Sequence, residues 1–560
     1  MNTAMDLTSP DATLERATAL LNTGKLDEAA LLCAGGGDDP RLQRISAYVH
    51  QEQGRLRQAA SAYEIVLRAF PQDWESFNNY GNALLGLDRY DEAVAAFQRA
   101  IQLKPDQAQI VFNLSGALER AERHEERVAV MRMWASIDGE DAKGQTELGL
   151  AEAAVDDFAA AERAFRTAIR LDPGRVEAWL DLGLVLETLN RVDDLATLAA
   201  EAAAAGLGAE AHFLRAWALR RQGRHADALV EAEAVPATIN PVRRQHLLAG
   251  LYDRLGRPAE AFAAFETMNR AAEAVSPQPP GPTYRDMVTA AAERTTQDWV
   301  AGWTRFEVAP VPPAPVFILG FPRSGTTLLD TLLMNLPSLH VLEEQPIMTR
   351  VEAAIAPDGD LGRMSAEEAR GIRAYYFQLL EATAPPPRGR TVVDKHPLHS
   401  ARMPLLQRVF PDAKIVFVER HPCDVVLSCF MANFTLNPGM RSFTRLDEAA
   451  RTYDAVLDAW TRAEALLPLN VHRIRYERMV EDLAGEMRPL LDFLGLPWDE
   501  KVLDNEGAAQ ARGRVRTASY AQVGEPIYTR ASGRWESYRD QMAEVLPILA
   551  PWVEKLGYTL

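Results

Sequence analysis

The sequence is poor in cysteine and has no long apolar segment. Its three cysteines, Cys33, Cys423 and Cys429, include no C-x-x-C pair, which indicates neither a disulfide framework nor a structural zinc site. No uninterrupted apolar run approaches the roughly 18–20 residues that a helix needs to cross a bilayer. The first residues also lack the basic and apolar segments of a secretory signal. We therefore expect no membrane span and a cytoplasmic location.

Basic residues are the minority among the charged ones. The chain has 60 Lys and Arg against 78 Asp and Glu, for a net charge of −18. This balance disfavours nonspecific binding to nucleic acids or anionic membranes, so we expect no nucleic-acid partner. An anionic ligand would need locally concentrated positive charge. The length of 560 residues exceeds what one core accommodates and predicts two or more domains.

The first half of the chain repeats itself every 34 residues. The register is kept by prolines, alanines, phenylalanines and glycines: Pro71, Pro105, Pro173 and Pro241; Ala59, Ala93 and Ala161; Phe97 and Phe165; Gly81, Gly149 and Gly183. The clearest unit, Trp74–Pro105, resembles the tetratricopeptide repeat (TPR), with its G-x-A-L and EA-x3-F-x2-A patterns. Stacked helix pairs of this kind form an α-solenoid, a superhelix whose concave face suits a peptide or a partner protein.

Two proline-rich segments interrupt the helical pattern. SPQPPGPT spans Ser276–Thr283, and a second spacer spans Val308–Pro315, with a helical segment between them. Beyond them, apolar strands and long helices alternate, which is typical of an α/β domain with a parallel sheet. We therefore expect a TPR superhelix over residues 1–275, a proline-rich linker with a capping helix over 276–315, and an α/β domain over 316–560.

The α/β region opens with a strand, a loop and a helix start. Val316–Leu319 is a short apolar run, and the turn GFPRSGTT follows it. Gly320 and Gly325 let the backbone wrap around a phosphate, where unpaired N–H groups converge. Their spacing is that of a P-loop, but Thr326 stands where the P-loop lysine belongs, and the cation of the loop is Arg323. The segment therefore predicts an anion site.

That loop resembles the 5′-phosphosulfate-binding loop of sulfotransferases, which use 3′-phosphoadenosine 5′-phosphosulfate (PAPS). It is most similar to the P-R-S-G-T-T loop of the protein-tyrosine branch. The resemblance implies a P-loop-like fold and a PAPS cofactor held by the loop residues Pro322, Arg323, Ser324, Gly325, Thr326 and Thr327.

A second anion-binding element follows the next strand. Lys414–Cys429 reads KIVFVERHPCDVVLSC, so Arg420 ends a strand at the edge where parallel sheets bind ligands. Ser428 lies eight residues later, in the following helix. The sulfotransferase resemblance implies that this pair holds the 3′-phosphate of the cofactor. A further arginine that the family offers is Ala432 here.

The acid–base candidates lie in two short motifs. Glu343 and Glu344 follow the loop helix in HVLEEQP, and Lys395 follows the strand-like run TVVD. Sulfuryl transfer to a hydroxyl requires a base that removes the acceptor's proton. The resemblance implies that Glu344, 21 residues after Arg323, is this base and that Lys395 stabilises charge on the bridging oxygen. His396 is the competing base, because cytosolic sulfotransferases use a histidine.

The resemblance assigns three more residues towards the C-terminus. Tyr476, in VHRIRYERMV, would contact the adenine side of the cofactor. Ser519 would lie at the transferring sulfonate, and Arg534, in place of a family lysine, would grip the 3′-phosphate. Glu525 stands where the family has another lysine, so this loop departs from the pattern.

We expect a PAPS-dependent sulfotransferase that moves a sulfuryl group to an acceptor hydroxyl, with the TPR groove capturing the acceptor or a partner. The resemblance suggests peptide tyrosine, and a saccharide, lipid or small molecule stays open, as does the oligomeric state. No metal is needed, since there is no β,γ-phosphate pair to bridge. One alternative is a P-loop small-molecule kinase, which would need a lysine at position 326. The other is a TPR scaffold with a noncatalytic nucleotide-binding domain.

Overall fold

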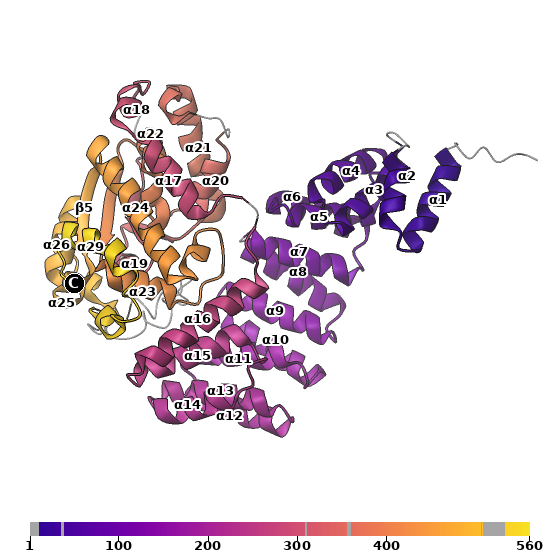
Figure 1. Ribbon diagram of the computed structural model, residues 1–560, viewed down its shortest axis with the longest axis horizontal. Coiled ribbons are helices and arrows are strands. Elements are labelled where there is room, and N and C mark those ends of the chain that lie inside the picture. Colours follow the sequence, from indigo (N-terminus) through magenta and orange to yellow (C-terminus); the bar gives the residue numbers. More distant parts are fainter. Residues whose placement is uncertain are drawn as a thin grey trace, which may run out of the picture. The chain divides into compact units, whose positions relative to one another are not determined.

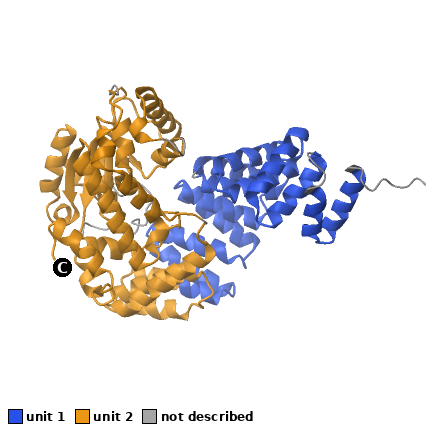
Figure 2. Ribbon diagram, turned by 45° about the horizontal axis from the view of Figure 1, so that its top comes forward, with its two compact units in different colours: residues 1–214 blue, residues 215–560 orange. Residues whose placement is uncertain are grey.

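The computed structural model describes residues 10–34, 39–121, 123–279, 281–307, 311–355, 360–505, 507 and 532–560. The chain divides into two compact units, residues 1–214 and 215–560 (Figure 2). The first contains helices alone among its described residues, and the second contains the sheet.

The first unit is a series of helices in which each packs on the next from α1 to α12 (Figure 1). Their bounds are α1 (Pro10–Asn22), α2 (Leu26–Ala34), α3 (Pro40–Glu52), α4 (Leu56–Ala69), α5 (Trp74–Leu85), α6 (Tyr90–Leu103), α7 (Ala108–Arg120), α8 (His124–Ile137), α9 (Ala142–Ala154), α10 (Phe158–Leu171), α11 (Val176–Thr188) and α12 (Val192–Ala204). Helix α13 (Gly208–Arg221) crosses the boundary between the units.

Close packing within helix pairs explains why the sequence repeats. A Cβ added to Gly81 in α5 would lie 2.7 Å from the ring of Phe97 in α6, and one added to Gly149 in α9 would lie 2.6 Å from the ring of Phe165 in α10. Both phenylalanines are fully buried. The same glycine–phenylalanine contact therefore recurs two repeats later, and a larger residue at either glycine would displace a core ring.

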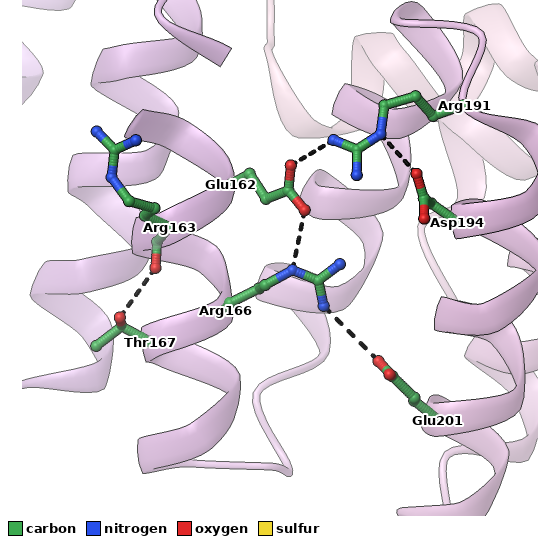
Figure 3. Close-up of polar contacts among 7 residues, drawn as sticks. All are labelled: Glu162, Arg163, Arg166, Thr167, Arg191, Asp194 and Glu201. Carbon is green, nitrogen blue, oxygen red and sulfur yellow. Dashed lines mark hydrogen bonds and ion pairs between the residues drawn. The ribbon is translucent and has the colours of Figure 1, made fainter. Parts of the chain in front are cut away.

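Ion pairs connect helices of neighbouring repeats in this unit. Glu162 of α10 accepts hydrogen bonds from Arg166 (3.0 Å) and from Arg191, which precedes α12 (Figure 3). Arg191 also bonds Asp194, and Arg166 lies 3.8 Å from Glu201. The two arginines and Asp194 and Glu201 are 38–49% exposed, and Glu162 is 18% exposed. The network ties two repeats together at the edge of solvent.

The second unit begins with helices of the region predicted to form TPR repeats, namely α14 (His225–Ala234), α15 (Pro241–Arg254) and α16 (Pro258–Val275), followed by α17 (Tyr284–Arg294) and α18 (Gln297–Ala301). The strands are β1 (Val316–Gly320), β2 (Leu339–Glu343), β3 (Thr391–Lys395), β4 (Lys414–Glu419) and β5 (Asn470–Arg475). The helices between and after them are α19 (Thr326–Met334), α20 (Ile347–Ala353), α21 (Ala366–Thr383), α22 (Met403–Val409), α23 (Pro422–Phe430), α24 (Leu446–Leu466), α25 (Tyr476–Glu481), α26 (Leu483–Leu494) and α29 (Leu546–Lys555).

The sheet is parallel in all its pairings, with strand order β2-β3-β1-β4-β5. Successive residues of a strand face opposite cores: Ile318 packs with α19, α25 and α26, whereas Phe317 packs with α21 to α24 and α29. Helices therefore cover both faces, which explains why the central strand β1 is apolar and buried at every position. Ligands bind such sheets at the carboxyl ends of the strands.

The last repeat helices pack on the sheet domain within this unit. Phe262 of α16 stacks on Phe430 at the end of α23, with ring centroids 4.9 Å apart. The buried amide of Asn269 donates to the carbonyl of Phe430 (3.0 Å), and Arg285 of α17 pairs with Glu448 of α24 (2.8 Å). Helix α23 is thus supported by repeat helices as well as by the sheet.

The expected fold class is confirmed: a helical repeat region precedes an α/β domain with a central parallel sheet. The strand β2 was not expected from the sequence. The boundary expected at residue 275 stays a prediction, drawn from sequence pattern, while the compact units divide at residue 214. Among the described helices, none combines the length and the apolar character that crossing a membrane requires.

Candidate active site at the carboxyl end of the sheet

The loop after β1 is built around two glycines that tolerate no side chain. A Cβ on Gly320 would lie 2.7 Å from Ser324 Oγ and 2.8 Å from the carbonyl oxygen of Val418 on the neighbouring strand. Gly325 has a φ of +105°, and its Cβ would lie 2.5 Å from the ring of Tyr476. The loop therefore passes close to β4 and to Tyr476, and α19 begins directly after it at Thr326.

Arg323 joins the loop to the next helix. Its backbone has a φ of +69°, which a non-glycine residue adopts at an energetic cost, and strain of this kind clusters at functional sites. The Nε of Arg323 donates to Ser428 Oγ (3.1 Å), and Nη1 of Arg420 donates to the Arg323 carbonyl (2.8 Å). The structure thus brings together three residues that the sequence motifs singled out separately.

Tyr476 and Ser324 complete this anion-binding cluster. Tyr476 begins α25, and the guanidinium of Arg420 lies over its ring, 4.7 Å from the centroid. Ser324 Oγ is buried and has no hydrogen-bond partner among the described residues. A buried hydroxyl without a partner is costly, and it suits an anion held at the N-terminus of α19.

A second cluster centres on Lys395 at the end of β3. Its side chain is fully buried, and its Nζ lies 2.8 Å from Glu344 Oε1, 3.2 Å from Asp330 Oδ2 and 3.8 Å from Glu343 Oε1. Burial lowers the pKa of the Lys395 ammonium, but the three carboxylates outweigh burial and raise it above its ordinary value. Lys395 is therefore charged at any physiological pH.

Glu344 is attached to Lys395 at both its backbone and its side chain. Its backbone N–H donates to the Lys395 carbonyl (2.8 Å), while its carboxylate accepts from the Lys395 ammonium. Its φ of +47° is again left-handed. At 33% exposure, the Glu344 side chain is more accessible than the other two carboxylates of the cluster.

His396 directly follows Lys395 and lies next to this cluster. Its ring stacks on that of His399, with centroids 4.3 Å apart, and its Nδ1 is buried with no hydrogen-bond partner in the described part of the chain. Burial lowers the pKa of His396 to about 4, against a smaller opposing effect of Glu344. The imidazole is therefore neutral at pH 7 and only weakly basic.

The two clusters meet at the ends of β1 and β3. Ile318 pairs with Lys395 in the sheet, and the backbone N–H of His396 donates to the Ile318 carbonyl (3.2 Å). Ser400 Oγ donates to the carbonyl of Gly320, the residue that opens the loop (3.1 Å). The anion-binding loop and the lysine–carboxylate cluster thus share one edge of the sheet.

Arg534 is held by a repeat helix. It pairs with Asp253 of α15 (2.9 Å), which also accepts a hydrogen bond from Tyr538 (2.6 Å). The backbone on either side of Arg534 is bonded to the first turn of α23, because the N–H groups of Gly533 and Trp535 both donate hydrogen bonds to the Asp424 carboxylate. The structure therefore anchors Arg534 near the Arg420 turn and directs its side chain to α15. Ser519 lies outside the described residues.

Sequence reasoning missed two buried aspartates of this site. Asp424 holds the segment at 533–535, and its position in the first turn of α23 was the available signal. Asp330 contacts Lys395 from α19, and nothing in LLDTLL distinguishes it from a surface residue. Within the described ranges, no group of three or more His, Cys, Asp or Glu residues could hold a metal ion.

Comparisons with known proteins match separate parts of the chain to two families. Residues 315–500 match the sulfotransferase family, and residues 46–108, 81–142 and 146–206 match the tetratricopeptide repeat. Glu344, Lys395, Arg420, Ser428 and Tyr476 lie within the first match. These matches to the sulfotransferase family and to the tetratricopeptide repeat confirm the resemblance inferred from the motifs.

Individual relatives match part of the chain. The chain is 27% identical to an uncharacterized protein of Aquifex aeolicus, over 43% of this chain and 33% of that protein. It is 28% identical to protein-tyrosine sulfotransferase 1 of Danio rerio, over 43% of this chain and 72% of that protein. A solved tetratricopeptide repeat protein from Parabacteroides merdae covers 42% of this chain and 93% of its own, with 15% identity and a TM-score of 0.36. The chain therefore spans about a third of the length of its Aquifex relative.

Proposed function

We propose that the protein is a PAPS-dependent sulfotransferase that moves a sulfuryl group to an acceptor hydroxyl. The observation that carries this proposal is the hydrogen-bonded set of Arg323, Ser428 and Arg420 around the loop, beside the Lys395–Glu344 pair. An anion-binding loop alone would suit many ligands. The adjacent lysine and accessible carboxylate add the charge and the base that group transfer to a hydroxyl requires.

The residues present fit PAPS. The N-terminus of α19, the buried Ser324 hydroxyl and Arg323 would hold the 5′-phosphosulfate, together with Pro322, Gly325, Thr326 and Thr327. Arg420 and Ser428 would hold the 3′-phosphate, and Tyr476 the adenine side. When bound, the cofactor supplies a sulfuryl group on a phosphate leaving group. Arg534 and Ser519 remain candidates for the same ligand on the sequence pattern.

Glu344 is the base that the geometry favours. Its carboxylate is partly exposed, so an acceptor hydroxyl can reach it, and it can take up that hydroxyl's proton. His396 is the weaker candidate, because its pKa of about 4 leaves the imidazole little affinity for a proton. Lys395 stays charged and provides positive charge where negative charge develops on the leaving oxygen.

Peptide tyrosine is the acceptor that we propose, because relatives of this chain are protein-tyrosine sulfotransferases. The TPR repeats would capture the acceptor or a partner protein, since such repeats form extended protein-binding surfaces.

Calorimetric titration with adenosine 3′,5′-bisphosphate tests the cofactor assignment. The wild type should bind it without Mg²⁺, and Arg323→Ala should lose about 2 kcal/mol of binding free energy, because a charge-assisted contact disappears. Arg363→Ala is the matched control, since the Arg363 side chain is 90% exposed and lies outside the site.

Binding of ATP with Mg²⁺ in place of the bisphosphate would contradict the proposal and favour a kinase. Equal affinities of the wild type and Arg323→Ala would contradict the assignment of the loop.

A further inference from the structure

Asp330 has no role in the function proposed above, yet it lies against the residue at its centre. It stands in the second turn of α19, its side chain is fully buried, and its Oδ2 lies 3.2 Å from Lys395 Nζ. Asp330 and Lys395 are 65 positions apart in the sequence, and they belong to α19 and β3, which both follow the loop along the chain.

The cluster holds more negative charge than Lys395 needs. One carboxylate would neutralise the ammonium, and three lie within 3.8 Å of it. Removing each further ion from water costs several kcal/mol after relaxation. A fold that needed only a stable lysine would be better served by one partner and apolar neighbours, so the additional buried carboxylate calls for a role in the chemistry.

The carboxylates differ in whether they can exchange protons with an acceptor. Glu344 is 33% exposed and Asp330 is not exposed at all. Asp330 is also fixed on a helix: the neighbouring Thr331 hydroxyl donates to the Thr327 carbonyl (2.7 Å) and lies 3.3 Å from Asp330 Oδ1. One partner of Lys395 is therefore open to substrate, and another is sealed and rigid.

We propose that Asp330 is a positioning residue that shares the Lys395 ammonium with Glu344, so that the lysine stays charged and in place when Glu344 takes up the acceptor's proton. Once Glu344 is protonated, it no longer neutralises Lys395 by charge. Asp330, together with the more distant Glu343, then keeps the ammonium beside the loop.

Asp330 also sets the proton affinity of Glu344. The Lys395 ammonium favours ionised Glu344, whereas Asp330 and Glu343 disfavour it. A further titratable neighbour is His396 after β3, which is neutral at pH 7, and the charge of Arg402 helps to lower the pKa of that histidine. Removing the charge of Asp330 leaves the ammonium to Glu344 and the more distant Glu343, so ionised Glu344 is favoured more strongly and Glu344 becomes a weaker base.

This inference rests on the proposed function, but its first test does not require activity. The urea midpoints of four proteins are compared: wild type, Asp330→Asn, Lys395→Met and the double variant. If Asp330 secures Lys395, Asp330→Asn lowers the midpoint when Lys395 is present, and the double variant unfolds at a higher urea concentration than Asp330→Asn alone. Such recovery identifies the two side chains as coupled.

A double variant that is no more stable than Asp330→Asn would overturn the proposal. Failure of both Asp330→Asn and the double variant to fold would also overturn it, because Asp330 would then be needed for folding whether or not Lys395 is present. Should Asp330→Asn alone fail to fold, folding of the double variant supports the coupling. A wild type that transfers no sulfate would contradict the proposed function and leave the stability result to decide the pairing.

The second test is kinetic and uses labelled PAPS with a tyrosine peptide. Asp330→Asn should lower kcat about tenfold, leave the KM for PAPS within about threefold, and move the acid limb of the kcat profile to lower pH. Glu343→Gln, the matched control at 3.8 Å, should shift the limb less. In the Lys395→Met background, Asp330→Asn should cause no further loss. An unmoved acid limb, or an equal loss in that background, would overturn the role assigned to Asp330.

Discussion

Two groups of ion pairs, one in each compact unit, differ in how far water reaches them. Around Glu162, in the repeats, two arginines pair with three carboxylates (Figure 3). All five side chains are partly exposed to water. Around Lys395, one sealed ammonium faces three carboxylates, two of them nearly or fully buried. Exposed pairs contribute little net stability because water competes for both ions. Buried pairs are costly to assemble and to break.

The difference separates structural from chemical uses of charge. The network around Glu162 connects α10 with α12, and other side chains could make the same connection. The Lys395 cluster contains an excess of buried negative charge beside an anion-binding loop, which packing alone would disfavour. Substitutions in the first region should therefore change stability slightly, and substitutions in the second should change chemistry strongly.

The largest effect is expected for Lys395→Met. Without the ammonium, charge developing on the leaving oxygen is no longer stabilised, and kcat should fall on the order of 10²–10³-fold. Binding of adenosine 3′,5′-bisphosphate should change less than about threefold, because that ligand has no sulfonate. Arg191→Met, the corresponding change in the repeats, should leave kcat unaltered. If Lys395→Met kept more than a tenth of the wild-type kcat, the Lys395 cluster would not have the chemical role that distinguishes it from the ion pairs around Glu162.

A buried carboxyl near the site should make stability depend on pH. Burial raises the pKa of Asp394 to about 6, although the hydrogen bond from Tyr376 opposes this. The folded state therefore holds this proton more tightly than the unfolded chain, so stability falls as pH rises from about 4 to 6 and is constant above that range. The pKa difference corresponds to roughly 3 kcal/mol.

Urea unfolding of wild type and Asp394→Asn at pH 4, 5, 6 and 7 measures this effect. The stability of the variant relative to wild type should rise over that interval. Parallel curves for the two proteins would show that Asp394 has an ordinary pKa in the folded state.

The smallest effect is expected for Glu162→Gln. Burial raises the pKa of Glu162, but hydrogen bonds from Arg191 and Arg166 outweigh it and lower the pKa below its ordinary value. Its contribution to stability is therefore present above the unfolded pKa and is lost as pH falls through the folded one. Because the arginines are exposed, the loss at pH 7 should stay below about 1 kcal/mol. If Glu162→Gln lost as much unfolding free energy as the titration of Asp394 changes, exposure to water would not determine how much an ion pair contributes to stability.

Local motifs singled out residues that the structure brings together around the loop after β1. The glycines, Arg323, Arg420 and Ser428 could be located because each stands at a fixed offset within a strand–loop–helix pattern. The 34-residue period likewise reveals a recurring contact, such as that of Gly81 with Phe97. In both cases the residues that form each pattern lie within a few tens of positions along the chain.

Long-range partners could not be read from the sequence. Asp330 looks like any polar residue of an amphipathic helix until β3 places Lys395 beside it. The pairing of Arg534 with Asp253 joins residues 281 positions apart, through a repeat helix that packs on the sheet domain. The strand β2 was missed because only Leu339 and Leu342 among its five residues are buried, so its apolar signal is weak.

The most direct test is a single assay of sulfate transfer from labelled PAPS to a tyrosine peptide by wild type and Glu344→Gln. Calorimetry with adenosine 3′,5′-bisphosphate confirms that both proteins bind the nucleotide equally well. We predict transfer by the wild type and a loss on the order of 10²–10⁴-fold in the variant, the usual contribution of a general base. Equal transfer by the two proteins would contradict the assignment of Glu344 as the base beside Lys395.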